Sequence, residues 1–153
     1  MPSVSAKQSS FTYLSVYNGV SALGWIAVIA MTLLGFNSIS MLRLVQSAAI
    51  MEILHSLLGW VRSPLLANMI QVGSRLWITW LFVKQGDSLY MALVMAWGLA
   101  DICRYLYYLY PQNPKLCWCR YTLFIVLYPV GVTCEMLLMA RMIEAWPWLK
   151  LLL

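Results

Sequence analysis

Charged side chains are scarce in this chain. They make up 10% of its 153 residues, whereas hydrophobic side chains make up 63%. Soluble domains are typically about a quarter charged. The ten basic and five acidic residues give a formal net charge of +5, but they form no dense basic run of the kind that binds nucleic acid. The composition therefore excludes an ordinary soluble domain and a nucleic-acid partner, and it indicates a membrane protein whose basic residues meet anionic lipid headgroups.

Histidine and cysteine are too few for a typical metal centre. His55 is the only histidine, so the single Glu52-x-x-His55 pair cannot supply the two such motifs that a di-iron carboxylate bundle requires. The four cysteines lie in or beside apolar segments, where cysteine behaves as a small hydrophobic residue. Cys117 and Cys119 have one residue between them, which is closer than the usual zinc-site spacing. We therefore expect no metal site and no disulfide framework.

Familiar catalytic signatures are also missing. The sequence has no G-x-S-x-G nucleophile elbow, no Walker loop and no Rossmann glycine fingerprint. A cysteine phosphatase needs C-x5-R spacing, but Cys134 and Arg141 are separated by six residues, and Cys117 and Arg120 by two. These absences argue against nucleophilic hydrolysis, phosphatase chemistry and nucleotide binding.

Long apolar runs dominate the sequence instead. We expect five membrane-spanning helices, at residues 13–35, 41–60, 65–83, 88–110 and 117–141. Residues 13–145 are accordingly expected to form one all-α, polytopic transmembrane bundle. We interpret residues 1–12 as a polar N-terminal tail and residues 146–153 as a short tail that begins a truncated sixth span.

Ionisable side chains interrupt these apolar runs. Those well within the expected spans are Glu52, His55, Arg75, Asp101, Arg104 and Glu135. Each is costly at membrane depth, by ~2.5–3.5 kcal/mol, so we expect them to face a shared interior. Arg75 needs a partner, for which Glu52 and Asp101 are candidates, and Asp101 fits a local ion pair with Arg104. Glu52 and His55 share a helical face, and either hydrogen bonds to other helices or substrate contact would explain them.

Aromatic residues crowd the end of the fourth expected span. They are Tyr105, Tyr107, Tyr108 and Tyr110. Tyrosine is enriched where a helix leaves the membrane. We interpret the four as an interfacial aromatic belt.

Residues 117–141 carry the most specific chemistry. Tyr128 and Glu135 are seven residues apart, which is about two helical turns, so they share one helix face at roughly 10 Å along the axis. Pro129 is expected to kink the helix between them. A neutral phenol can donate a proton and a carboxylate can accept one, so the pair suits elimination of water beside a carbonyl. The alternative is a buried tyrosine–glutamate hydrogen bond that fixes helix register.

Motifs spread over residues 13–139 resemble one known family. They are YLSVYN at 13–18, LVQSAAIMEILHSLLGWVRSP at 44–64, QVGSR at 71–75, WGLADICRYLYY at 97–108 and RYTLFIVLYPVGVTCE at 120–135. In this order they resemble the 3-hydroxyacyl-CoA dehydratases of very-long-chain fatty acid elongation, once called protein tyrosine phosphatase-like proteins. The pattern Y-P-x-G-x-x-x-E is the most specific of them. Family members usually carry glutamate where this chain has Asp101, and they usually continue through a sixth span.

The resemblance implies a hydro-lyase of the endoplasmic reticulum membrane. It would convert a 3-hydroxyacyl-CoA into a trans-2-enoyl-CoA and water, the third step of elongation, without a metal or redox cofactor. Tyr128 and Glu135 match the family's catalytic residues; we assign Glu135 as the base and Tyr128 as the acid, and the reverse assignment stays open. The implied partners are the condensing enzyme, the ketoacyl-CoA reductase and the enoyl-CoA reductase.

Further polar residues are expected to serve the substrate. Candidates for binding the CoA phosphates are Arg104, Arg120 and Lys115, although lipid phosphate explains their placement equally well. Supporting or substrate-contact roles are expected for Glu52, His55, Arg75 and Asp101. Two other functions stay open: an inactive scaffold of the same fold for elongation enzymes, and an ion or proton pathway.

Overall fold

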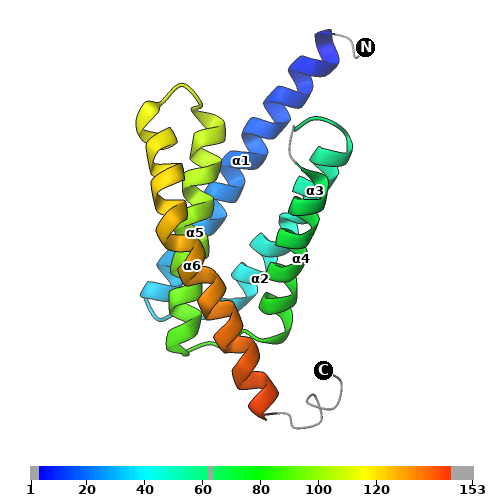
Figure 1. The fold of residues 1–153 in the computed structure, drawn as a ribbon. Helices are drawn as coiled ribbons and strands as arrows, with labels where there is room; N and C mark the ends of the chain where they lie inside the picture. The colour runs from blue at the N-terminus through cyan, green and yellow to red at the C-terminus, as the bar shows by residue number, and fades with distance from the viewer. Residues whose placement is uncertain (1–3, 62–63, 146–153) are drawn as a thin grey trace.

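The computed structural model describes residues 4–61 and 64–145, which form an all-α fold, as the sequence predicts (Figure 1). The helices are α1 (Val4–Leu33), α2 (Ile39–Ala48), α3 (Ile50–Leu57), α4 (Leu65–Leu81), α5 (Ser88–Leu109) and α6 (Pro114–Ala145). Since α1 begins at Val4, most of the expected N-terminal tail is helical. The expected C-terminal tail, residues 146–153, lies outside the described residues.

Three of these helices are long and apolar enough to cross a membrane. The candidate spans are Thr12–Leu33 in α1, Ser88–Leu109 in α5 and Pro114–Arg141 in α6. The remaining helices are shorter, with 10 residues in α2, 8 in α3 and 17 in α4. A multi-pass membrane architecture is thus supported directly by three helices.

The second expected span, residues 41–60, differs from the prediction because it is divided into α2 and α3 at Ala49. The Ala49 N–H donates to the Gln46 carbonyl at 3.2 Å, and the Glu52 N–H donates to the Ala49 carbonyl at 3.0 Å. Both bonds link residues three apart, which is the tighter 3₁₀ pattern. No glycine or proline lies at the break, so the sequence carries no recognisable signal for it.

The core forms where α5 packs between α1 and α6 (Figure 1). Trp25 of α1, Leu93 and Trp97 of α5 and Leu138 of α6 are all buried in it. Helices α2, α3 and α4 make the other side of the molecule, and α4 also touches α6. This arrangement brings α4, α5 and α6 around a common space.

Side-chain hydrogen bonds cap the N-termini of α5 and α6. The Asp87 side chain accepts a hydrogen bond from the Leu89 N–H at 3.0 Å and caps α5. The Asn113 side chain accepts from the Lys115 N–H at 3.0 Å at the start of α6. Pro129 lies inside α6 without ending it, so Tyr128 and Glu135 stand on one helix, on either side of a missing backbone donor.

Candidate active site

A cavity of about 440 Å³ opens between α4, α5 and α6. Tyr128 and Glu135 both line it, as do Arg75, Asp101 and Arg104 from the facing helices. Its other walls are largely apolar: Ile70, Ala96, Ala100, Leu123, Phe124, Leu127 and Val132. The structure therefore gathers the predicted tyrosine and glutamate around one space with four of the predicted binding or supporting residues: Arg75, Asp101, Arg104 and Arg120.

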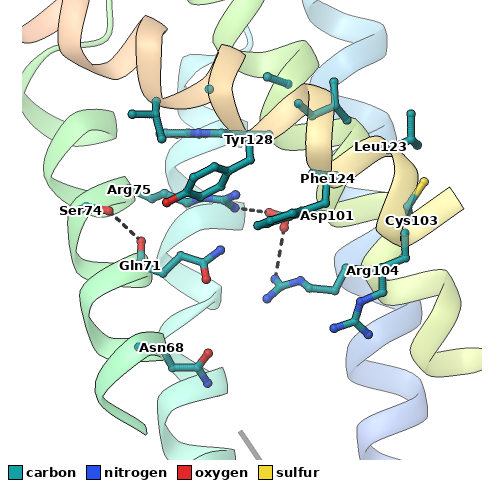
Figure 2. A pocket seen from close by; sticks show the side chains of 18 of the residues that line it. Asn68, Gln71, Ser74, Arg75, Asp101, Cys103, Arg104, Leu123, Phe124 and Tyr128 are labelled. Carbon is teal, nitrogen blue, oxygen red and sulfur yellow. Dashed lines mark hydrogen bonds and ion pairs between the residues drawn. The ribbon is translucent and has the colours of Figure 1, made fainter. Parts of the chain in front are cut away.

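Tyr128 stands at the open side of this cavity. Its side chain is 57% exposed, and its ring stacks on Phe124 with centroids 4.9 Å apart. Figure 2 shows the phenol reaching from α6 across the cavity towards Arg75 on α4. The hydroxyl is thus presented to whatever occupies the cavity.

Glu135 lies deeper, against α5. Its Oε1 accepts a hydrogen bond at 3.0 Å from the indole Nε1–H of Trp97, a side chain that is 3% exposed. Among the described residues no hydrogen bond joins Glu135 to Tyr128, so the register-fixing bond considered as an alternative is not formed. The two groups share the cavity but not a direct contact.

A series of ion pairs lines one side of the cavity and continues away from it to Glu52. Arg75 Nη1 lies 2.6 Å from Asp101 Oδ2, and Arg104 Nη2 lies 3.4 Å from Asp101 Oδ1. Arg104 also binds Glu52 through both terminal nitrogens, each 2.8 Å from a carboxylate oxygen, and the Tyr105 hydroxyl donates to the same carboxylate. The expected Asp101 pairs are therefore confirmed. Asp101, despite its short side chain, reaches both arginines.

Glu52 and His55 lie away from Tyr128, in a second cavity of about 220 Å³ that also involves α1. His55 Nε2 is 3.2 Å from the Tyr13 hydroxyl. The bonds of Glu52 to α5 and of His55 to α1 confirm the interpretation that this pair is hydrogen-bonded to other helices. Arg104 and Tyr108 line both cavities, so the ion-pair chain lies between them.

The tyrosines at the end of α5 do not form one interfacial belt. Tyr105 is 2% exposed and belongs to the buried ion-pair chain, so that part of the interpretation is wrong. Tyr107 and Tyr108 face Arg120, whose guanidinium carbon lies 4.8 and 5.0 Å from their ring centroids, and their place in an aromatic belt stays a prediction. Arg120 lines the larger cavity, whereas Lys115 does not.

Sequence reasoning missed Trp97 and Tyr105 as site residues. Trp97 and Asp101 are four residues apart and so share the face of α5 that meets α4 and α6. That spacing marks a common face, but it does not reveal that the indole meets a carboxylate 38 residues away. The assembled site holds a carboxylate that can accept a proton and a phenol that can donate one, and the carboxylate is linked through Trp97 and Arg75 to the buried ion pairs.

Comparison with known proteins gives the same family from several directions. The family model for protein tyrosine phosphatase-like protein, PTPLA, matches residues 46–151. A probable very-long-chain (3R)-3-hydroxyacyl-CoA dehydratase of Schizosaccharomyces pombe is 33% identical, over 84% of this chain and 72% of its own length. PASTICCINO 2 of Arabidopsis thaliana, also named as such a dehydratase, is 36% identical over 80% of this chain and 65% of its own.

A human relative, very-long-chain (3R)-3-hydroxyacyl-CoA dehydratase 2, is 36% identical over 82% of this chain and 57% of its own length. The chain thus spans between 57% and 72% of these three curated relatives. No solved structure is significantly similar to it. The family model covers more than half of the chain, and the similarity to these relatives extends over at least 80% of it. The chain therefore belongs to the protein tyrosine phosphatase-like family, PTPLA.

Proposed function

We propose that this chain is a very-long-chain (3R)-3-hydroxyacyl-CoA dehydratase. The observation that carries the proposal is that Tyr128 and Glu135, which match the family's catalytic residues, line one cavity bounded by α4 and by the membrane-length helices α5 and α6. The relatives named above are dehydratases of this class. The product would be a trans-2-enoyl-CoA and water.

In the proposed mechanism the Glu135 carboxylate takes a proton from C2 of the thioester. The C2–H electron pair becomes the C2=C3 double bond as the C3–O bond breaks, and the departing oxygen takes the phenolic proton of Tyr128. Water leaves, and a proton then passes from Glu135 to Tyr128, which restores both groups. General acid–base catalysis requires each group to come within hydrogen-bond reach of the proton that it moves, and both side chains line the cavity in which the substrate would bind.

The walls of the cavity fit the two ends of such a substrate. The apolar side chains of α4, α5 and α6 suit an acyl chain, because burying it removes apolar surface from water. Arg120 lies at the α5–α6 end and suits a CoA phosphate. Arg104 is held by Glu52 and Asp101, so its role in the proposal is support, together with Glu52, Arg75 and Asp101.

We further propose that α2–α3 and α4 lie within the membrane beside the three candidate spans, which makes five crossings. The bundle would reside in the endoplasmic reticulum, next to the condensing enzyme and the two reductases that supply its substrate and consume its product. The buried charges on α3, α4 and α5 support this placement, since they pair with one another rather than face outward.

The test is turnover of a long-chain (3R)-3-hydroxyacyl-CoA by the purified chain in lipid nanodiscs, with the enoyl product measured by mass spectrometry. We expect the wild type to form the product and Tyr128→Phe and Glu135→Gln to lose at least a hundredfold in kcat. Tyr110→Phe is the matched control, because Tyr110 is an exposed tyrosine outside both cavities; it should keep full activity.

Two results would overturn the proposal. Turnover that survives both Tyr128→Phe and Glu135→Gln would remove the site assignment. A folded wild type without turnover, but with retained binding to elongation enzymes, would favour the scaffold function instead.

A further inference from the structure

The indole of Trp97 is wedged between α5 and α6 at the proposed base. It is 3% exposed, and its Nε1–H donates to Glu135 Oε1 at 3.0 Å. An indole has only this one donor. The donor is therefore committed to a single carboxylate oxygen.

The chain leaves room for the indole on one side of this contact. Gly131 stands one helical turn before Glu135. A Cβ at position 131 would lie 3.4 Å from Trp97 Cδ1 and 3.5 Å from Nε1. A hydrogen there lets the nitrogen edge of the ring lie directly against α6, and any side chain larger than alanine would press on it.

Arg75 holds the same ring from α4. Its guanidinium carbon lies 5.2 Å from the Trp97 ring centroid, within cation–π range. Arg75 is itself anchored to Asp101 at 2.6 Å. The buried ion-pair chain, the indole and the carboxylate are thus connected in series, from α4 through α5 to α6.

We propose that Trp97 is a positioning residue for Glu135, binding one carboxylate oxygen so that the other faces the substrate's C2 hydrogen. This inference rests on the proposed function and adds a residue to its machinery. Proton transfer depends steeply on the alignment of donor and acceptor, and a carboxylate that is free to rotate spends less time in the productive orientation. Asp101 and Arg75 act one step further away, by holding the ring.

The decisive variant is Trp97→Phe, which removes the N–H and keeps an aromatic ring. We expect kcat to fall by about 10- to 100-fold with KM within a factor of about two, which is a loss of about 1.4–2.7 kcal/mol in transition-state stabilisation. The kinetic isotope effect on a substrate deuterated at C2 should rise, because proton abstraction becomes more rate-limiting. Adding Trp97→Phe to Glu135→Gln should cause no further loss.

The matched control is Trp25→Phe. Trp25 is 1% exposed and packs in the same core, but it lies on α1, and within the described residues no hydrogen bond joins it to Glu135. The Trp25→Phe variant should have a lower melting temperature than the wild type and the same kinetic isotope effect. Benzothienylalanine in place of Trp97, which replaces the N–H by sulfur in a ring of similar shape, repeats the test if Trp97→Phe fails to fold.

The outcomes separate this inference from the proposed function. If Glu135→Gln abolishes turnover but Trp97→Phe keeps the wild-type kcat and isotope effect, Trp97 only packs and the inference falls alone. The inference also falls if Trp97→Phe raises KM without lowering kcat, or if Trp25→Phe lowers kcat and raises the isotope effect as much as Trp97→Phe does. If Glu135→Gln retains turnover, both the catalytic assignment and the positioning role are overturned.

Discussion

Glu52 and Arg104 are 52 positions apart in sequence, yet they form a bidentate ion pair with two contacts of 2.8 Å. Their side chains are 13% and 20% exposed. The pair joins α3 to α5, and Arg104 extends it to Asp101. This buried pair therefore links α5 to α3, a helix that otherwise packs against α2 and α4.

We therefore expect strong coupling between these two residues. Glu52→Leu or Arg104→Leu alone should cost about 3–5 kcal/mol of stability, because each leaves a buried charge without its main partner. The double variant should lose much less than the sum of the two. Thermal unfolding in detergent gives the four stabilities, and additive losses would contradict the coupling.

A second, exposed pair provides the control for that cycle. Arg141 lies 2.8 Å from Asp87, but its side chain is 57% exposed. Exposed pairs typically contribute about 0–1 kcal/mol. The same cycle with Asp87→Ala and Arg141→Ala should show coupling within that range.

The sequence predicts the local chemistry of the site and offers Asp101 as a partner for Arg75, but it does not predict the other contacts between helices. The spacing of Tyr128 and Glu135 on one helix predicts their shared cavity, because helical periodicity is set by nearby residues. The contact of Trp97 with Glu135 joins two helices, and one sequence has no signal for such a pairing. The break at Ala49 was missed for a related reason, since no residue type there favours it.

Close approach of α1 and α5 predicts a second stability effect. A Cβ on Gly98 would lie 2.7 Å from Ile29 Cδ1 and 3.1 Å from Trp25 Cε3. We expect Gly98→Ala to cost about 1–3 kcal/mol, because a buried interface without free space must shift to accept a methyl group. The control is Gly73→Ala in α4, where nothing lies within 4 Å of the new Cβ. It should be neutral or stabilising in thermal unfolding, since alanine favours helix more than glycine does.

The contact between Asp87 at the start of α5 and Arg141 near the end of α6 should make the free energy of unfolding depend on pH. The backbone N–H of Leu89, together with Arg141, holds the pKa of the Asp87 carboxyl below its ordinary value. A carboxyl whose pKa is lower in the folded state stabilises the fold fully above its unfolded pKa of about 3.9, and that contribution is lost as the pH falls through the folded pKa.

Melting temperatures of wild type and Asp87→Asn, measured from neutral pH down to about pH 3, test this relation. The wild type should be more stable at neutral pH, and the gap should narrow in the acid range. Curves that stay parallel over the whole range would show that Asp87 does not carry the effect. Lys84→Ala, an exposed change in the same loop, should leave the pH dependence intact.

If the substrate is an acyl-CoA, we expect replacement of Arg120 to change KM rather than kcat. Its guanidinium lies over the rings of Tyr107 and Tyr108 and lines the cavity near the start of α6. A phosphate contact there is made equally before and during the reaction, so Arg120→Ala should raise KM for the acyl-CoA roughly tenfold with little change in kcat. Added salt should weaken binding by the wild type more than by the variant, because the lost contact is electrostatic.

Lys84→Ala removes a positive charge at the opposite end of α5 and serves as the control for Arg120→Ala; it should leave both KM and kcat unchanged. A fall in kcat at constant KM would instead place Arg120 among the groups that act on the reacting carbons.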